Sequence, residues 1–271
     1  MTLLLVTYLA ALVVAAVGLA TYMRASKTPP NVQFGFRAAP ALVSRRLWRK
    51  INRLAGLMAI ADAMLVFPLS LLLDEVTLLV CFALSLPVLE GILAAYSRLV
   101  LEREAGLDAG GHVPLRKLPV IKVDVRVVLV AAVVMVGTVA ALLWAGRFLP
   151  ERVAAHFDLA GRPNLYMHRE SFLLLFSAAY SAIVAGLSLL LLSCGGVPLV
   201  PWARDYQEEL ERVLRHALLA VSVLLPGVAF LIIQYNIHGK HVVDMNLAAL
   251  ALVCATLGIL LKGLIGRRSS G

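Results

Sequence analysis

The chain has 271 residues, of which 61% are hydrophobic and only 15% are charged. A water-soluble protein of this length needs much more polar surface, so this composition excludes a soluble globular domain. The net charge of +9 occurs without any nucleic-acid-binding motif, and we attribute it to contact with an anionic membrane surface.

Seven separate apolar stretches are each close to the length that crosses a bilayer. A hydrocarbon core of roughly 30 Å needs about 20 helical residues. The stretches cover residues 3–23, 54–73, 76–96, 127–149, 171–192, 216–237 and 245–265. The first has no Lys or Arg ahead of it and is too long for a signal-peptide core, so we expect it to be a retained helix. The sequence predicts an all-α, polytopic membrane protein with about seven transmembrane helices.

The distribution of basic residues predicts the orientation in the membrane. Of the 25 Lys and Arg residues, 20 lie on one side of the predicted membrane, in residues 24–53, 97–126, 204–215 and the tail from 262. The loops 147–170 and 238–244 carry the other five. Because cytoplasmic loops are enriched in Lys and Arg, we expect the N-terminus outside and the C-terminus inside, in a prokaryotic cytoplasmic membrane.

One segment reads as a linker and divides the chain. Residues 101–124 combine glycines, prolines and mixed charges, which is typical of a cytoplasmic linker. It separates a three-helix membrane half, 1–100, from a four-helix half, 125–271. In the second half, small residues recur every four positions around Gly137 and around Gly186, so we expect the helices that carry them to pack closely.

The predicted outer loop 149–166 contains a specific motif. Its residues are Pro150, His156, Phe157, Asp158, Gly161, Pro163, Asn164 and Tyr166. The loop resembles the signature of a prokaryotic membrane domain of unknown function, DUF1648: Leu-Pro, then His-Phe-Asn/Asp, then Gly-x-Pro-Asp and an aromatic residue. Asn164 stands where that family usually has Asp, and Tyr166 stands near its usual Trp. Glycine and proline at 161–163 predict a tight turn in this loop.

A second motif lies in the predicted cytoplasmic loop after the first span. It comprises Gly35, Arg37, Trp48 and Asn52, followed by Gly56. This pattern resembles the SdpI immunity-protein domain, in which a short loop precedes a pair of membrane helices. In SdpI-type proteins the two domains usually come in the reverse order, so the halves of this chain are exchanged.

The resemblance implies a non-enzymatic membrane protein that senses a signal or confers immunity. Proteins of the SdpI type protect their host from a secreted peptide toxin, and the best-known one also holds a soluble repressor at the membrane. The expected partners are therefore a secreted peptide outside, a soluble repressor inside and the lipids of the anionic inner leaflet. We expect no nucleic-acid partner.

Basic residues around 45–53 offer a surface for two of these partners. No acidic residue occurs between positions 24 and 61. Each basic residue near an anionic leaflet contributes about 1 kcal/mol, so the patch can hold the loop on the membrane. The same patch, with Arg45 and Arg46 in it, is the alternative docking face for a repressor.

The predicted outer side also gathers imidazole and carboxylate groups, which suit a divalent metal or a proton-sensing cluster. The candidate ligands are His156, Asp158, His168, His238 and His241. We expect His156 and Asp158 to approach the loop 238–244. The alternative is ordinary interfacial hydrogen bonding, because no paired-histidine spacing is present. No cofactor is otherwise predicted. A membrane-embedded metal-dependent hydrolase is the enzymatic alternative that these residues leave open.

Two acidic residues, Asp62 and Glu90, lie inside the second and third predicted spans. A charged carboxylate there costs a few kcal/mol unless it is paired, protonated or hydrated. We expect the two to share a proton, or to take Arg53 or Arg98 as counter-ion. They also provide the basis for a third function class, a small transporter.

Overall fold

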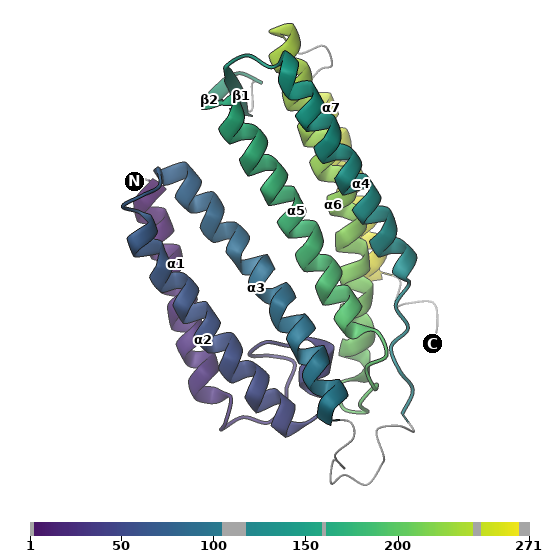
Figure 1. The fold of residues 1–271 in the computed structure, drawn as a ribbon. Helices are drawn as coiled ribbons and strands as arrows, with labels where there is room; N and C mark the ends of the chain where they lie inside the picture. Colours follow the sequence, from purple (N-terminus) through teal and green to yellow (C-terminus); the bar gives the residue numbers. More distant parts are fainter. Residues whose placement is uncertain (1–2, 105–117, 159–160, 241–244, 266–271) are drawn as a thin grey trace. The chain divides into compact units, whose positions relative to one another are not determined.

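The computed structural model describes residues 3–104, 118–158, 161–240 and 245–265 (Figure 1). Almost all regular structure is helical, with one short two-stranded sheet. The elements in chain order are α1 (Leu3–Arg24), η1 (Ala39–Leu42), α2 (Arg45–Leu69), α3 (Glu75–Glu104), α4 (Val125–Ala145), η3 (Gly146–Phe148), β1 (Arg152–Phe157), β2 (Pro163–His168), α5 (Arg169–Cys194), α6 (Arg204–His238) and α7 (Met245–Ile265).

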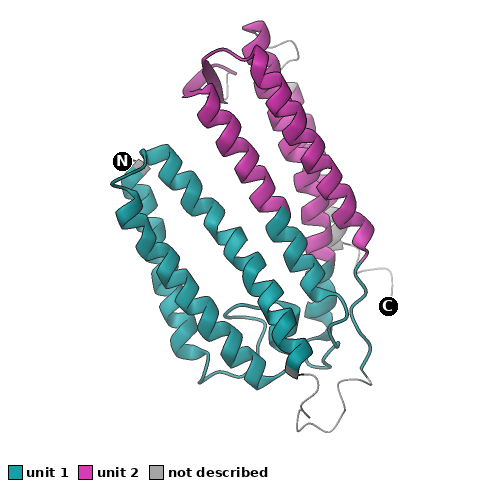
Figure 2. Ribbon diagram, viewed as in Figure 1, with its two compact units in different colours: residues 1–123, 185–211 teal, residues 124–184, 212–271 magenta. Residues whose placement is uncertain are grey.

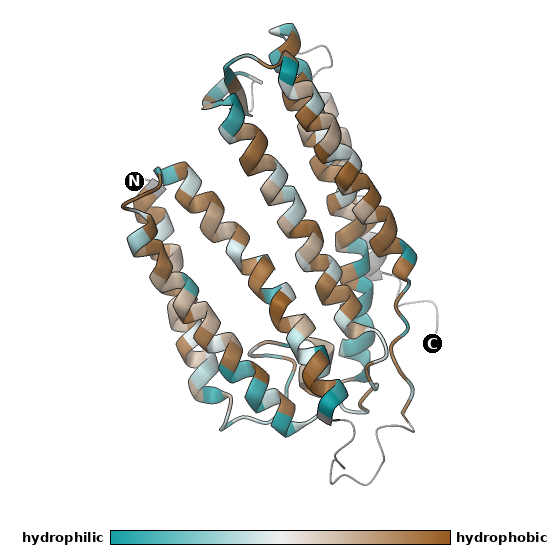
Figure 3. Ribbon diagram, in the orientation of Figure 1, coloured by the Kyte–Doolittle hydropathy of each residue, from teal (hydrophilic) through white to brown (hydrophobic). Residues whose placement is uncertain are grey.

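Within the described residues, the six helices α1 to α6 are long and apolar enough to cross a membrane. Hydrophobic residues run along α3, α4 and α5 in Figure 3. Large apolar side chains such as Leu12, Met64 and Val133 are more than 60% exposed, as expected for side chains that face lipid. The protein is therefore an all-α, multi-pass membrane protein. The seventh predicted stretch forms α7, and the number of seven spans stays a prediction, as does the orientation.

The chain forms two compact units (Figure 2). The first comprises residues 1–123 and 185–211, and the second comprises 124–184 and 212–271. Helices α5 and α6 are each divided between the two units, with one end in the first unit and the other end in the second. The division of the sequence into the halves 1–100 and 125–271, with a linker at 101–124, stays a prediction.

In the first unit, α1 and α2 approach each other closely at two glycines. A Cβ atom on Gly56 would lie 2.6 Å from the carbonyl oxygen of Gly18 and 2.7 Å from the backbone nitrogen of Tyr22. A Cβ on Gly18 would lie 2.9 Å from the carbonyl oxygen of Gly56. Distances this short leave no room for a side chain at either position. Because glycine has none, the backbones of α1 and α2 can touch here, as at the small-residue contacts of other membrane helix pairs.

A second glycine contact, also in the first unit, joins α3 to the end of α5. A Cβ on Gly186 would lie 2.5 Å from the carbonyl oxygen of Pro87, and a Cβ on Gly91 would lie 3.1 Å from the Cα of Gly186. Gly186 therefore packs against α3, whereas we expected it in a contact between the helices that became α4 and α5. A Cβ on Gly137 of α4 would meet nothing within 4 Å.

Side-chain caps fix where α2 and α3 begin. The Ser44 hydroxyl accepts a hydrogen bond from the Leu47 N–H at 3.2 Å, which caps α2. The Asp74 carboxylate accepts from the N–H groups of Val76 and Thr77, both at 3.1 Å. Hydrogen bonds from Thr77, first from its side chain and then from its backbone, hold the pKa of Asp74 below its ordinary value.

The second unit has its own apolar core beside the sheet. Leu142 of α4, Val153 of β1, Phe172 of α5 and Ile232 of α6 are buried together in it. A Cβ on Gly146 would lie 2.7 Å from Cδ1 of Leu173, so α4 and α5 do pack closely, but at this end. This core seats the two strands on the helices.

Candidate functional site

The loop with the DUF1648-like motif forms an antiparallel hairpin, residues 152–168. Its register pairs Arg152 with His168 and Ala154 with Tyr166, and it is irregular between Ala154 and Phe157. We expected the turn at residues 161–164, but Pro163 and Asn164 belong to β2. Gly161, just before this strand, adopts a φ of 73° that favours glycine, and its N–H donates to the Asp158 carbonyl at 2.9 Å. Pro150 is exposed just before β1, and Pro163 begins β2 opposite Phe157.

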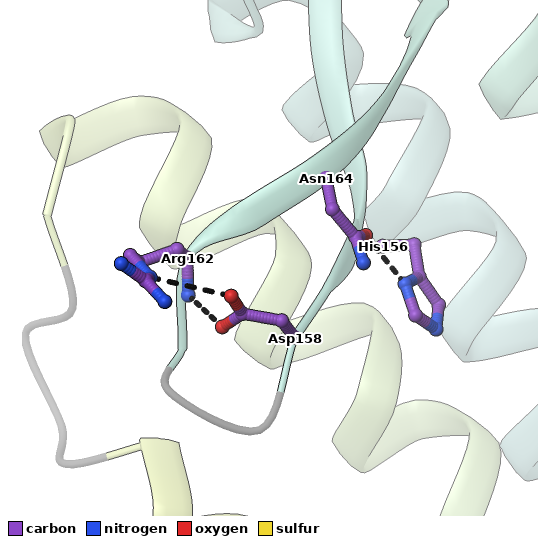
Figure 4. A network of polar contacts seen from close by, with 4 residues as sticks. All are labelled: His156, Asp158, Arg162 and Asn164. Carbon is purple, nitrogen blue, oxygen red and sulfur yellow. Dashed lines mark hydrogen bonds and ion pairs between the residues drawn. The ribbon is translucent and has the colours of Figure 1, made fainter.

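Two polar pairs close the tip of the hairpin (Figure 4). His156 Nδ1 lies 2.6 Å from Asn164 Oδ1 across the strands. Asp158 accepts hydrogen bonds from the backbone N–H of Arg162 at 2.8 Å and from its Nε at 3.2 Å. The His156–Asn164 pair joins the two strands, and the Asp158–Arg162 pair joins the residue that follows β1 to the residue that precedes β2. His156 and Asp158 have separate partners, so the structure does not show them sharing one ion.

The hairpin is fixed to α6 by a residue that the sequence motifs did not include. The side-chain amide of Asn236 accepts from the Ala154 N–H at 2.8 Å and donates to the Ala154 carbonyl at 3.0 Å. It also donates to the Ile232 carbonyl at 2.9 Å. The Phe157 ring packs edge-on against Tyr235, with centroids 4.8 Å apart. The backbone of β1 is therefore hydrogen-bonded on both edges, to β2 and to Asn236.

No group of three or more His, Cys, Asp or Glu residues suited to a metal occurs in the described part of the chain. His168 lies at the end of β2 and His238 at the end of α6, and both are exposed. Residues 241–244, with His241, fall outside the described residues. The expected approach of His156 and Asp158 to the loop 238–244 therefore stays a prediction. The divalent metal therefore stays a prediction, to be checked by metal analysis of the purified protein.

The second motif, with Gly35, Arg37, Trp48 and Asn52, holds the loop between α1 and α2, residues 25–44, which we call the motif loop. Asn52 of α2 is buried, and its Oδ1 accepts from the Phe36 N–H at 2.6 Å. Its Nδ2 donates to the carbonyls of Trp48 at 3.1 Å and Phe36 at 3.3 Å. Gly35 has a φ of 90°, and a Cβ there would collide with Oδ1 of Asn52. Asn52 therefore requires glycine beside it.

Trp48, Asn52 and Gly56 are spaced four residues apart, so they lie along one face of α2. This face meets the motif loop and α1. The Trp48 ring lies close to Gly35, Asn52 binds Phe36, and Gly56 touches α1. The motif spacing is thus explained by one continuous helix contact in the first unit.

The motif loop also packs on the segment before and at the start of α6. Leu42 and Trp48 are buried with Val200 and Ala203. The amide of Gln207 accepts from the Val200 N–H at 2.9 Å and donates to the carbonyl of Pro198 at 3.2 Å and to that of Ala39 at 3.5 Å. Gln207 is fully buried and ties residues 198–207 to the motif loop.

A cavity of about 420 Å³ lies in the first unit, among α1, α2, α3 and the motif loop. Ligand pockets usually have volumes of about 300–1,000 Å³, so it is large enough for a small molecule. Most of its lining is apolar, from residues such as Val17, Met58 and Leu93. Glu90 of α3 and Arg37 of the motif loop are the two charged side chains that line it. The motif residues Gly35 and Arg37 thus form part of the cavity wall.

The two intramembrane acids have different surroundings. Ser85 Oγ donates to Asp62 Oδ2 at 2.8 Å, whereas Glu90 lines the cavity. Neither predicted counter-ion takes that role in the structure. Arg98 pairs with Glu102 at 2.8 Å, and the guanidinium of Arg53 lies over the Tyr22 ring, 5.9 Å from its centroid. Serine therefore supplies the polar contact of Asp62 that we expected from a second carboxyl group or an arginine.

Comparison with known families finds a match in the second half of the chain. Residues 133–179 match the Domain of unknown function (DUF1648). The matched segment begins in α4, includes the whole hairpin and ends in α5. The chain is thus similar to this domain in the region where the sequence motif was noted. No match was found among curated proteins or among solved structures.

Two site residues, Asn236 and Gln207, were not predicted from the sequence, although the sequence contains an indication of each. Asn236 is an amide at the end of an otherwise apolar run, beside Gln234. Gln207 lies in the polar segment 205–215, in which charged residues surround it. A buried amide next to an apolar span needs a hydrogen-bond partner, so each of these two residues indicates a contact. The sequence does not indicate which loop each of them contacts.

Proposed function

We propose that this chain is a non-enzymatic, SdpI-like integral membrane protein that receives a peptide or envelope signal on its hairpin. The single observation that supports this most is the anchoring of the hairpin by Asn236 to α6. A loop that only joined two spans would not need a side-chain amide bonded to both polar groups of one strand residue. A fixed hairpin with an exposed second strand is suited to binding a partner.

The motif loop provides the inner half of the proposal. Arg45, Arg46, Arg49 and Lys50 are exposed in the first turns of α2, while Leu47 and Trp48 between them are buried. Such a basic face attracts an anionic leaflet and can equally hold an acidic surface of a soluble repressor. Helix α6 carries Gln207, which holds the motif loop, and Asn236, which holds the hairpin. In this proposal the protein resides in a prokaryotic cytoplasmic membrane with the hairpin outside.

The proposal predicts that Asn236→Ala detaches the hairpin and abolishes its function. The substitution removes the partners of the Ala154 N–H and C=O, at a cost of about 1–3 kcal/mol. We expect faster amide hydrogen exchange in residues 152–157. We also expect a host that produces the wild-type chain to survive spent medium of the source organism better than a host that produces the variant.

Ile237→Ala is the matched control, because Ile237 is exposed on the same helix and is the next residue along the chain. It should leave both exchange and survival unchanged. If the wild-type chain, inserted correctly, gave no more survival than an empty membrane, the immunity role would be wrong. A maleimide that labels a cysteine at position 162 only after cell lysis would contradict the external hairpin.

The cavity favours a second candidate function, a small transporter with Glu90 as its proton-carrying group. A carboxyl group that lines a membrane cavity is a functional group by default, because burying it there is costly. Proteoliposomes with a trapped pH-sensitive dye test this function. Glu90→Gln should then lower proton flux about tenfold or more, and equal flux in wild type, variant and protein-free vesicles would exclude it.

A further inference from the structure

The two edges of the hairpin differ, and the difference is set by backbone geometry. In an antiparallel pair, opposite residues either exchange two hydrogen bonds or direct their N–H and C=O groups away from each other. Both polar groups of Ala154 bind Asn236, so Ala154 does not bond its opposite residue, Tyr166. The N–H and C=O of Tyr166 therefore point to the free edge of β2.

The neighbouring pairs give the same alternation. The Arg169 N–H donates to the Glu151 carbonyl at 2.8 Å, so that pair is hydrogen-bonded. In the next pair, Arg152 with His168, the N–H and C=O groups therefore point away from the partner strand. The same holds for Ala154 with Tyr166, two residues further along. The backbone groups of Tyr166 and His168 thus form a repeat of outward donors and acceptors along β2.

The edge of β1 is closed and that of β2 is open. Residues Val153 and Ala154 of β1 are buried, whereas Asn164, Leu165 and Tyr166 of β2 are exposed. In Figure 1, β1 lies nearer to α6 and α7 than β2 does. Proteins usually protect a strand edge with charges, and β2 contains no Lys, Arg, Asp or Glu. An exposed, uncharged edge is a template for another strand.

We propose that the free edge of β2 binds an extended peptide as a third strand of the sheet. This inference rests on the proposed function, in which the hairpin receives the signal, and it defines the signal as a peptide segment in strand conformation. The backbone groups of Tyr166 and His168 hold the peptide backbone. Leu165 and Tyr166 offer apolar surface to its side chains, which favours an uncharged, apolar segment.

Selection from a displayed library of random peptides tests the proposal. The peptides are about ten residues long, so that each is longer than an average strand. The target is the full chain in lipid nanodiscs, and the critical variant is Tyr166→Pro. Proline removes the outward N–H of Tyr166, and an outward position on an edge strand tolerates it. We expect peptides selected on the wild type to lose about tenfold or more in affinity, the equivalent of one backbone hydrogen bond.

Tyr166→Ala is the matched control, because it removes the same side chain and keeps the N–H. It should bind the selected peptides more tightly than Tyr166→Pro. Hydrogen exchange at the Met167 and Val153 amides checks that the hairpin is intact in both variants. N-methylation of a selected peptide should reduce binding at every second residue only, because alternate residues face the edge.

Equal affinity for wild type and Tyr166→Pro would overturn the proposal, and so would a library that yields no peptide. The outcome is independent of the survival assay. If peptides pair with the edge although the chain gives no protection, the binding mode stands and the immunity role fails. If the chain protects its host but Tyr166→Pro protects equally, the edge inference fails alone.

Discussion

Gly56→Leu should be the most destabilising single substitution in the first unit. Even its Cβ would lie within 2.8 Å of the Gly18 carbonyl oxygen, the Tyr22 backbone nitrogen and the Tyr22 Cβ. Two of these are backbone atoms, which cannot rotate away, so α1 and α2 must separate. Overpacking of this kind costs typically 1–3 kcal/mol, and we expect about 3 kcal/mol or more here. Thermal unfolding in detergent micelles or nanodiscs measures the loss.

Gly137→Leu is the matched control for this change. Gly137 is also a glycine inside a membrane helix, but a Cβ there would meet nothing within 4 Å. Leucine at this position should be neutral or stabilising, because it forms helix better than glycine. Equal destabilisation by both substitutions would show that the α1–α2 contact does not depend on close approach at Gly56.

Asn52→Ala should have the second largest effect, through the motif loop. The side chain satisfies the Phe36 N–H and C=O, and the site is 1% exposed, so water replaces it poorly. With each unsatisfied buried group costing about 1–3 kcal/mol, we expect a loss of about 2–4 kcal/mol. Unfolding temperature reports the stability, and protease cleavage within residues 25–44 reports the freed loop.

Asn31→Ala provides the comparison within the same loop. Asn31 accepts from the N–H groups of Gln33 and Phe34 at 3.1 and 2.9 Å, but it is partly exposed. Water can therefore replace its bonds, and the loss should stay below about 1 kcal/mol. If the two variants were equally stable, Asn52 would not be the residue that holds the loop.

Amide side chains towards the two ends of α6 each hold one loop. Asn236 binds Ala154, and Gln207 binds Ala39. Each is a single side chain that fixes a loop remote in sequence. Loss of either should free one loop and leave the other in place, and hydrogen exchange resolved by segment distinguishes the two.

The hydrophobic pattern was sufficient to identify the six membrane-length helices among the described residues. This is a local property, because the length of an apolar run follows the thickness of the bilayer. The turn predicted at 161–164 lies elsewhere, because Pro163 and Asn164 belong to β2. The motif residues Gly35, Trp48 and Asn52 were also noted from sequence, and they do contact one another. The small strands around the turn were not predicted, because Arg152–Phe157 mixes apolar and polar residues without strict alternation.

The partners of the polar side chains were not predictable in the same way. Asp62 and Glu90 were expected to interact, and Asp62 instead binds Ser85. Gly186 was assigned to the wrong neighbouring helix. Each of these depends on how a helix is rotated about its axis. In an apolar span that is uniform around its circumference, the sequence pattern does not define the rotation.

The sequence by itself determined that lipid surrounds this chain and where its helices run, because these follow from the composition of contiguous segments. Only the tertiary structure decided which distant groups meet. Asn236 lies 82 residues from Ala154, and Gln207 lies 168 residues from Ala39. The physical reason is that a hydrogen bond depends on position and direction in space, and packing between helices sets both.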